Sequence, residues 1–393
     1  MTESDEKGRK ENDEWSAIIP AGGTGSRLRP LTSEIPKPLV PVANMPLIDY
    51  AVSHLIYAGI KHIIITLAHK GEKIKRHLEE TWTPEKLAGA KIESHIIDSK
   101  GNADAFRMLQ DHIKTEKVLV SMSDVVTNLP LKKFMDFHSE KGGIASMSMK
   151  TVESNISQYG VALLDKDRKI HLFLEKPAPM ELYVSSIARK ADLFLHTNII
   201  NTGIYAFDRR IANILTETEF IDFGGEVFPY LLETGKDLYG FIENYYWMDC
   251  GKPQTYRWAN WDVLRKYAWP ITPKGKEYDE TFVVGVINSG DNVIIESPSC
   301  FGEYVQLFDD VKVKALTSIG NHVNIHEKSI IEKSILWNYV EVGEDCKIEN
   351  SIICNDVEIG NGCEIKGSIV APHCNVSDNS TIKDRSLDLG EEL

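Results

Sequence analysis

The chain is 393 residues long and has 58 acidic against 44 basic side chains, which gives a net charge of −14 at neutral pH. This length exceeds that of one ordinary core, so we expect two domains in a soluble globular protein. The acidic balance argues against non-specific nucleic-acid binding, and no stretch reaches the roughly 18 consecutive apolar residues of a membrane helix. We therefore expect neither nucleic acid nor membrane as partners, and phosphates held by local cations.

The N-terminal segment, residues 1–14, is charged throughout and lacks the apolar region of a signal peptide. Its composition predicts a disordered tail. The six cysteines form no CxxC pair, so they indicate neither a zinc site nor a disulfide framework. We expect a cytoplasmic protein in which the cysteines act as small apolar residues.

The stretch at residues 17–41 reads AIIPAGGTGSRLRPLTSEIPKPLVP and is rich in glycine and basic residues. Its apolar start predicts a buried parallel strand, and the glycines that follow let the backbone turn tightly and approach a ligand. Three cations follow in the same loop: Arg27, Arg29 and Lys37. Prolines on both sides of Lys37 limit where this lysine can point. The sequence therefore predicts a phosphate site at the end of this strand.

Two common phosphate-binding loops do not fit this stretch. A Walker loop needs Lys and Ser or Thr directly after its last glycine, whereas Ser and Arg follow Gly25. The dinucleotide fingerprint needs a third glycine, and Leu28 does not supply it. The loop instead resembles the signature of the sugar-1-phosphate nucleotidyltransferases, also called nucleotide-sugar pyrophosphorylases, which is GGxGxRLxPLT followed by PKP. The chain has this pattern in full over residues 22–32 and 36–38.

Helical and strand patterns alternate after the loop. We expect helices at 46–59, 71–80, 103–113 and 131–140, and strands at 62–66, 91–98, 117–124, 144–150, 160–165, 170–175 and 202–208. Such alternation predicts parallel βαβ units, a sheet covered on both faces, and ligands at the carboxyl ends of the strands. An aromatic-rich helix between residues 247 and 269 is expected to close the first domain.

The C-terminal third contains an internal repeat with a period of 17 residues. Copies begin at Ser334, Ser351 and Ser368, and a fainter copy begins at Thr317. A branched apolar residue at about every sixth position is the hexapeptide pattern of a parallel β-helix, here with about four to five coils. Such a β-helix has an open end and flat faces, so we expect it to mediate homo-oligomer formation.

The expected fold class is therefore α/β: a Rossmann-like nucleotidyltransferase domain with a mostly parallel mixed sheet, followed by a left-handed parallel β-helix. The expected boundaries are a tail at 1–14, a catalytic domain at 15–268, a linker at 269–290, the β-helix at 291–385 and a second tail at 386–393.

The resemblance extends over residues 15–265 and implies site residues. Asp124 and Asp249 resemble the family's magnesium ligands, and Mg²⁺ is commonly bound by one or two carboxylates plus phosphate oxygens. The implied catalytic cations are Arg27, Lys37 and Lys176. The implied nucleotide-binding residues are Ala21, Gly22, Gly23, Gly25, Gly101 and Asn102. The implied sugar-binding residues are Ala103, Gly160, Glu175, Lys176 and Asn201.

The resemblance implies that the protein condenses a nucleoside triphosphate with a sugar-1-phosphate to give a nucleotide-sugar and pyrophosphate. Mannose-1-phosphate guanylyltransferase is the closest in pattern, and adenylyl, thymidylyl and uridylyl transfer stay open because Asn102 stands where the family commonly has threonine. Two further hypotheses are a catalytically silent regulatory subunit that binds nucleotide-sugars, and a second, acyl-transferring activity of the β-helix. The candidate bases for acyl transfer are His322, His326 and His373.

Overall fold

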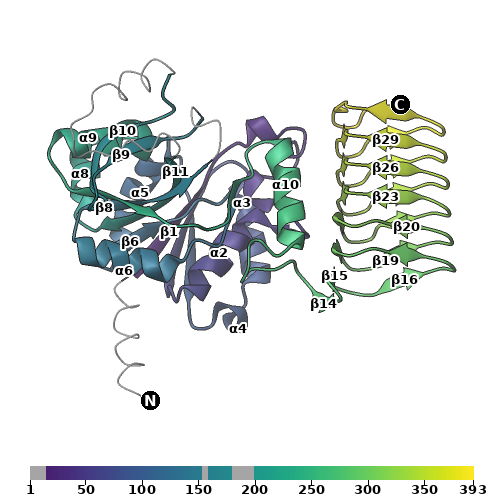
Figure 1. Cartoon of the computed structure of the whole chain (residues 1–393), viewed down its shortest axis with the longest axis horizontal. Helices are drawn as coiled ribbons and strands as arrows, with labels where there is room; N and C mark the ends of the chain where they lie inside the picture. Colours follow the sequence, from purple (N-terminus) through teal and green to yellow (C-terminus); the bar gives the residue numbers. More distant parts are fainter. Residues whose placement is uncertain (1–14, 153–157, 179–198) are drawn as a thin grey trace. The chain divides into compact units, whose positions relative to one another are not determined.

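The computed structural model describes residues 15–152, 158–178 and 199–393 (Figure 1), so the predicted tail at 1–14 lies outside the described residues. The chain divides into two compact units. The first unit comprises the chain up to Gly23, Ala51–Ser123 and Leu129–Trp247, and the second comprises Thr24–Tyr50, Asp124–Asn128 and Met248–Leu393. In the described ranges, no helix combines the length and the apolar character that crossing a membrane requires.

The first unit is built on a nine-stranded mixed sheet in the order β10-β9-β11-β6-β1-β4-β5, with β8 paired to β11 and β12 to β8. Its strands are β1 (Trp15–Ala21), β4 (His62–Leu67), β5 (Lys91–Ile96), β6 (Lys117–Val120), β8 (Ala145–Thr151), β9 (Val161–Leu164), β10 (Ile170–Leu174), β11 (Ile199–Asp208) and β12 (Leu238–Ile242). The half β6-β1-β4-β5 is parallel, whereas β11 runs antiparallel to β6, β8 and β9. The predicted mixed sheet is confirmed.

Helices cover this sheet on both faces. They are α3 (Gly71–Thr81), α4 (Pro84–Leu87), α5 (Asn102–Met108), α6 (Leu131–Lys141), α8 (Ile211–Thr218) and α9 (Phe228–Glu233), with the turns η3 (Gln110–His112) and η5 (Phe223–Val227). Ala17, Ile18 and Ile19 of β1 are all fully buried, as expected for a strand that is covered on both faces. Helix α2 (Leu47–Tyr57) begins in the second unit and ends in the first.

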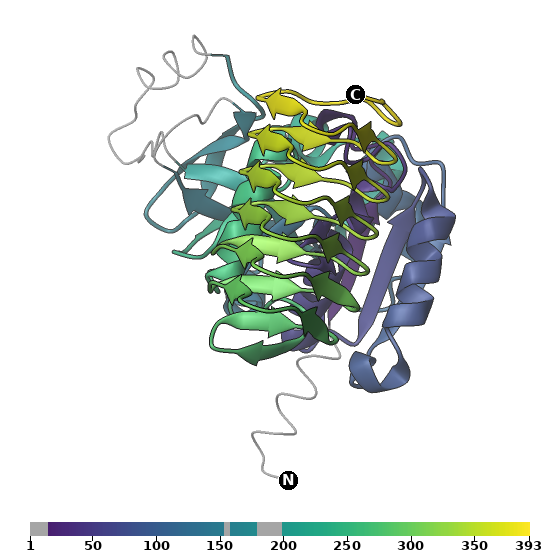
Figure 2. The same cartoon turned by 90° about the vertical axis from the view of Figure 1, so that its right-hand side faces the viewer.

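The second unit contains the β-helix, in which short parallel strands stack into three sheets (Figure 2). One sheet contains β14 (Lys276–Tyr278), β15 (Thr281–Val283), β18 (Ser299–Phe301), β21 (Thr317–Ile319), β24 (Ile335–Leu336), β27 (Ile352–Ile353) and β30 (Ile369–Val370). The second contains β16 (Ile287–Ser289), β19 (Val305–Leu307), β22 (Asn324–Ile325), β25 (Glu341–Val342), β28 (Glu358–Ile359) and β31 (Asn375–Val376). The third contains β17 (Ile294–Ile295), β20 (Lys312–Val313), β23 (Ile330–Glu332), β26 (Lys347–Glu349), β29 (Glu364–Lys366) and β32 (Thr381–Lys383).

The coil length changes along the β-helix. Ser299 pairs with Thr317, 18 residues later, whereas Ile335 pairs with Ile352, 17 residues later. The predicted 17-residue period therefore holds only for the later coils. The earlier 18-residue coils also show why the sequence gave a weak signal there, since a search at one fixed period misses them. The three sheets contain six coils, more than the expected four to five.

Buried side chains repeat along the later coils. Ser334, Ser351 and Ser368 form a ladder in which the backbone N–H of each later serine donates to the hydroxyl of the one before, at 3.1 Å. Cys346 and Cys363 occupy equivalent positions, because the thiol of each donates to a carbonyl 14 residues further on. The ladders satisfy polar groups inside the β-helix, which would otherwise destabilise a buried coil.

The ends of the β-helix extend beyond the predicted boundaries. Strands β15 and β16 lie in the range predicted as a linker, yet both pair in parallel with strands of the next coil. Leu387 lies in the range predicted as a tail, yet it is fully buried and its N–H donates to the Ile369 carbonyl at 2.9 Å. Both segments are short of hydrophobic residues, and their backbone pairing to an adjacent coil accounts for their ordered structure.

The aromatic-rich helix is α10 (Pro253–Leu264), and it belongs to the second unit rather than closing the first domain. The Tyr256 hydroxyl donates to the Pro41 carbonyl at 2.6 Å and accepts from the Trp337 indole N–H at 2.9 Å. Asn44 donates to the carbonyl of Ile319 in the β-helix at 2.7 Å. Helix α10, the glycine-rich loop and the β-helix are thus joined by hydrogen bonds within one unit.

Candidate active site

The glycine-rich loop folds back on itself within the second unit. Gly25 has a left-handed backbone, with φ of 66°. The Thr32 hydroxyl donates to the Gly25 carbonyl at 2.9 Å, and a Cβ at Gly25 would lie 2.9 Å from the Lys37 Cβ. Glycine is therefore required here both for the backbone conformation and for the close approach of Lys37. The short turns η1 (Ser26–Leu28) and η2 (Lys37–Leu39) follow in this loop, and strands β2 (Pro41–Val42) and β3 (Met45–Pro46) close it.

The remaining predicted residues at the end of β1 differ in their surroundings. Ala21 is buried, and a Cβ at Gly22 would lie 3.1 Å from the Ala68 Cβ. Gly23 is exposed, and a Cβ there would meet no atom within 4 Å. Gly22 is thus needed for packing inside the first unit, whereas no such constraint acts at Gly23.

Lys37 forms the centre of the charged cluster in the second unit. It is only 8% exposed, its ammonium group bonds to the Asp124 carboxylate, and its Nζ lies 3.9 Å from Asp249 Oδ1. Asp124 immediately precedes strand β7 (Val125–Thr127), and Asp249 ends strand β13 (Trp247–Asp249), which pairs with β7. This pairing is why two aspartates 125 residues apart in sequence reach the same lysine.

The charges of this cluster shift one another's pKa. Burial alone would lower the pKa of Lys37, but the attraction of Asp124 and Asp249 outweighs burial and raises it. Burial, followed by repulsion from Asp124, raises the pKa of Asp249. The cluster therefore holds a lysine that is firmly protonated beside a carboxylate that gives up its proton less readily than usual.

This donor set fits a divalent metal ion of the magnesium type. Such ions prefer oxygen ligands and are usually held by one or two carboxylates together with substrate phosphate oxygens. Asp124 and Asp249 both approach one cation, Lys37, and the raised pKa of Asp249 reports an excess of negative charge that a further cation would relieve. The two aspartates are thus the residues of this unit that could hold the metal.

Arg27 is exposed and lies beside the same cluster. A Cβ at Gly251 would lie 3.4 Å from the Arg27 guanidinium and 3.0 Å from Asp249 Oδ1. Gly251 therefore leaves room for the arginine to stand next to the aspartate. In this position Arg27 opposes the rise in the pKa of Asp249.

A second group of predicted residues lies in the first unit, around Glu175. A Cβ placed on either Gly160 or Gly224 would lie 2.7 Å from Glu175 Oε2, so this carboxylate is confined between two glycines. Burial raises the pKa of Glu175, and Lys176 opposes the rise from 3.3 Å away. Lys176 itself is mostly exposed, with a left-handed φ of 45°.

Asn201 is connected to Gly160 through its backbone. Its N–H donates to the Gly160 carbonyl at 2.7 Å. Its side-chain amide donates to the Tyr205 hydroxyl at 2.9 Å and accepts from the Gly203 N–H at 3.0 Å. The predicted sugar-binding asparagine is thus held in one orientation by two side-chain hydrogen bonds.

Gly101, Asn102 and Ala103 pack against the turn before η5. A Cβ at Gly101 would lie 2.4 Å from the Ile221 carbonyl oxygen, which also accepts from the Ala103 N–H at 2.9 Å. The Asn102 Oδ1 accepts from the Phe223 N–H at 2.8 Å. This position therefore orients a segment of the first unit, and the predicted contact of Asn102 with a nucleobase stays a prediction.

The structure describes the predicted residues as two groups in separate units. Sequence reasoning missed Gly224, which confines Glu175, and Cys250, whose thiol has a raised pKa because it is fully buried. The Gly-Gly pair in IDFGGEVFP was the available signal for Gly224, since two glycines inside a helical pattern indicate a close approach. The sequence offered no signal for the burial of Cys250 beside charged groups.

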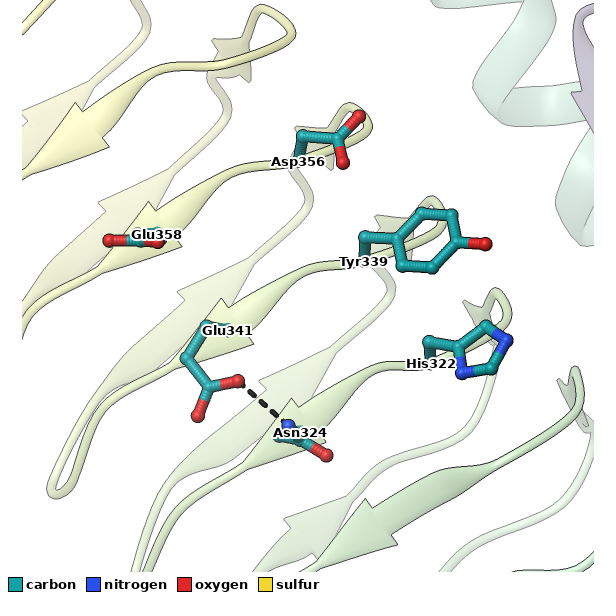
Figure 3. Close-up of a pocket in the computed structure, with 6 residues that line it drawn as sticks. All are labelled: His322, Asn324, Tyr339, Glu341, Asp356 and Glu358. Atoms are coloured by element: carbon teal, nitrogen blue, oxygen red, sulfur yellow. Dashed lines mark hydrogen bonds between the residues drawn. The ribbon is translucent and has the colours of Figure 1, made fainter.

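The β-helix has a pocket of about 600 Å³ on its surface (Figure 3). It is lined by His322, Asn324, Tyr339, Glu341, Asp356 and Glu358. The His322 ring stacks between two tyrosines, with centroids 4.8 Å from Tyr304 and 4.9 Å from Tyr339. Of the other two histidines proposed as acyl-transfer bases, His326 bonds to Glu341 and His373 lies 2.9 Å from Glu34. Each imidazole therefore already has an aromatic or carboxylate partner.

The comparisons with known proteins agree with this geometry. Residues 16–266 match the family model described as nucleotidyl transferase, and residues 288–389 match that of the EIF2B subunit epsilon LbH domain. The chain is 28% identical to a UTP–glucose-1-phosphate uridylyltransferase from Synechocystis sp., over 82% of each chain. It is 31% identical to a mannose-1-phosphate guanylyltransferase catalytic subunit beta from Drosophila pseudoobscura pseudoobscura, over 73% of this chain and 70% of the relative. The same subunit from Danio rerio is 33% identical over 61% of this chain and 62% of its own. The chain belongs to the nucleotidyl transferase family.

Proposed function

We propose that the protein joins a nucleoside triphosphate to a sugar-1-phosphate and releases pyrophosphate. An oxygen of the sugar phosphate attacks the α-phosphorus, and the bond from this phosphorus to the oxygen of the leaving pyrophosphate breaks. The nucleophile needs no general base, because a phosphomonoester with a second pKa near 6 is largely dianionic at neutral pH. The observation that carries the proposal is the buried Lys37 on two aspartates, an arrangement suited to phosphate charge.

In this proposal the cations offset the charge that builds up as two anions meet. Arg27 binds the triphosphate, Lys37 the transferring phosphate and Lys176 the sugar phosphate. Asp124 and Asp249 hold Mg²⁺, which when bound supplies positive charge to the phosphate oxygens. Glu175 accepts hydrogen bonds from sugar hydroxyls, and its confinement between two glycines supports this role because a fixed acceptor discriminates better than a mobile one.

We propose GTP and mannose-1-phosphate as the substrates, with GDP-mannose as the product. The support is that relatives from flies, fish, frogs and a plant are named mannose-1-phosphate guanylyltransferases. The Synechocystis relative favours UTP and glucose-1-phosphate instead, and it covers more of the chain. Adenylyl and thymidylyl transfer are the remaining alternatives for the same site.

The first test measures pyrophosphate release with Mg²⁺ for GTP, ATP, dTTP and UTP, each combined with mannose-1-phosphate, glucose-1-phosphate and N-acetylglucosamine-1-phosphate. We expect GTP with mannose-1-phosphate to give the highest kcat/KM. Another winning pair would replace the substrate assignment and keep the reaction. No release with any pair, together with measurable binding of a nucleotide-sugar, would support the silent regulatory subunit.

The β-helix is proposed to join copies of the chain into a homo-oligomer in the cytoplasm. Its support is the row of exposed aromatic rings on coil turns, which includes Tyr304 and Tyr339, 65% and 56% exposed. Light scattering on the purified protein tests this, and a monomer at micromolar concentration would contradict it. Release of coenzyme A from acetyl-coenzyme A with an amino-sugar phosphate would instead support the acyl-transfer hypothesis.

A further inference from the structure

A cluster of histidines surrounds one glutamate on strand β5, at the end of the sheet path of the first unit. Strands β4 and β5 pair in parallel, with His62 opposite Lys91 and Thr66 opposite His95. Side chains two residues apart on a strand point to the same face, so Glu93 and His95 project together beside His62. The turn η3 brings His112 to the same place.

The distances within this cluster are those of metal ligands. Glu93 Oε2 lies 3.3 Å from His112 Nδ1 and 3.7 Å from His95 Nε2, and one ligand atom from each residue lies within 4.8 Å of both others. Ligands held 2.0–2.1 Å from a tetrahedral zinc ion are about 3.3 Å apart. A small inward movement of His95 would therefore complete three corners of a tetrahedron around one ion.

Two buried nitrogens in this cluster lack hydrogen bonds. They are His95 Nε2 and His62 Nε2, and the latter lies 3.3 Å from Glu93 Oε1. The Ser16 hydroxyl lies 3.3 Å from the other ring nitrogen of His62 and accepts from the Thr115 hydroxyl at 2.9 Å, which leaves Ser16 a proton to donate to His62. A buried polar atom without a partner is destabilising unless something binds it, so these nitrogens point to a missing ligand.

A plain ion pair explains the cluster less well. Lys91 already balances the Glu93 charge, since its Nζ lies 2.5 Å from Oε1, and it holds the pKa of Glu93 down at about 2. The His95 and His112 rings lie with centroids only 4.2 Å apart. Two protonated rings at that distance would repel each other, whereas two neutral rings are the form that binds a metal.

We propose that Glu93, His95 and His112 bind a zinc ion, with His62 as a fourth donor. Two imidazoles and a carboxylate suit zinc, whereas magnesium and calcium prefer oxygen ligands alone. This site is distinct from the oxygen-only pair Asp124 and Asp249. A bound ion would tie β5 to β4 and η3, and so would fix the strand at the end of the sheet.

Titration calorimetry with ZnCl₂ on chelator-treated full-length protein tests this proposal. We expect one zinc per chain at this site, and His95→Ala/His112→Ala to lower its affinity at least about 10- to 100-fold, since even outer-shell changes have that effect. The isosteric Glu93→Gln variant should do the same with less disturbance of packing. His171→Ala is the matched control, because His171 lies 2.8 Å from Asp165 on β10, at the other end of the sheet path.

The nucleotidyltransferase aspartates are separated from this site by two further measurements. Asp249→Asn should keep the zinc that the histidine variants lose, and Co²⁺ in the wild type should show the visible absorption of an imidazole-bound ion. Zinc should also raise the thermal unfolding midpoint of the wild type but not that of Glu93→Gln. The proposal is overturned if the wild type binds no zinc, or if Glu93→Gln and the double histidine variant bind it as the wild type does.

Discussion

The two groups of predicted site residues are held in place by different means. In the second unit, Lys37 and two aspartates fix one another by charge, in a loop that hydrogen bonds join to α10 and the β-helix. In the first unit, Glu175 is held by shape, because two glycines leave room for its carboxylate and little else. The difference indicates that the phosphate-side group depends on its own charges, whereas the sugar-side group depends on its neighbours having no side chain.

Removal of Lys37 should have the largest effect. Lys37→Ala takes away a cation from the reacting phosphates and leaves Asp124 and Asp249 to repel each other. We expect kcat/KM to fall by about 10³ or more, together with a loss of stability, because a buried carboxylate has lost its partner. Steady-state kinetics and denaturant unfolding measure the two effects.

Arg27→Ala is the matched variant for that experiment. Arg27 is exposed, so its loss should lower kcat by about 10² to 10³ and leave the unfolding midpoint unchanged. Lys133→Ala on the surface of α6 is the inert control. Unchanged turnover in Arg27→Ala would remove the glycine-rich loop from the proposed mechanism.

Gly224→Ala tests confinement by shape. The new methyl group would lie 2.7 Å from Glu175 Oε2, so the carboxylate must move. A displacement near 1 Å can lower catalysis about 100-fold, and we expect the loss mainly as a higher KM for the sugar-1-phosphate. Gly225→Ala is the control, because a Cβ there would meet only Asp222 Oδ1 at 3.5 Å. Equal kinetics for the two variants would mean that Glu175 needs no such confinement.

Acid should weaken the first unit through two buried histidines. Burial lowers the pKa of His54 from 6.5 to about 4, and burial together with Lys117 does the same for His138. His54 Nε2 donates to the Leu129 carbonyl at 2.7 Å. Because both folded pKa values lie below the unfolded value, stability is greatest above about pH 6.5 and falls as the pH approaches 4.

At pH 5 the expected loss is about 2 kcal/mol of unfolding free energy per histidine. Hydrogen exchange at pH 7 and pH 5 measures it, and the amides of the first unit should lose more protection than those of the β-helix. In His54→Gln, a neutral side chain keeps an N–H donor, so the slope of stability against pH should decrease. A slope equal to that of the wild type would show that His54 is not neutral in the folded protein.

The sequence predicted the repeats better than the contacts between distant segments. The 17-residue period was readable because each coil pairs with the next, so Ser334, Ser351 and Ser368 recur at a fixed distance. The grouping of Asp124 with Asp249 depends on pairing between two short strands far apart in the chain, which no local pattern reports. For these aspartates, sequence reasoning had only the family resemblance to rely on.

The clustering on β5 was missed for a related reason. Glu93 and His95 form an alternating pair in the sequence, but His62 and His112 reach them only through strand register and a turn. Cysteine spacing was the metal signal considered, and histidines spread over 51 residues give no such spacing. A three-dimensional constellation of single residues from several elements is therefore the kind of site that sequence reasoning overlooks.

The smallest expected effect concerns the link between the β-helix and the glycine-rich loop. Trp337→Phe keeps an aromatic ring beside Tyr256 but removes the N–H that donates to its hydroxyl. The Tyr256 hydroxyl still donates to the Pro41 carbonyl, so the second unit should lose only about 1 kcal/mol of stability. If charge alone fixes Lys37, kcat should change less than about threefold, because a 1 kcal/mol effect on folding need not reach the transition state. A fall in kcat of tenfold or more, with folding intact at the assay temperature, would instead mean that the β-helix holds the loop in its active conformation.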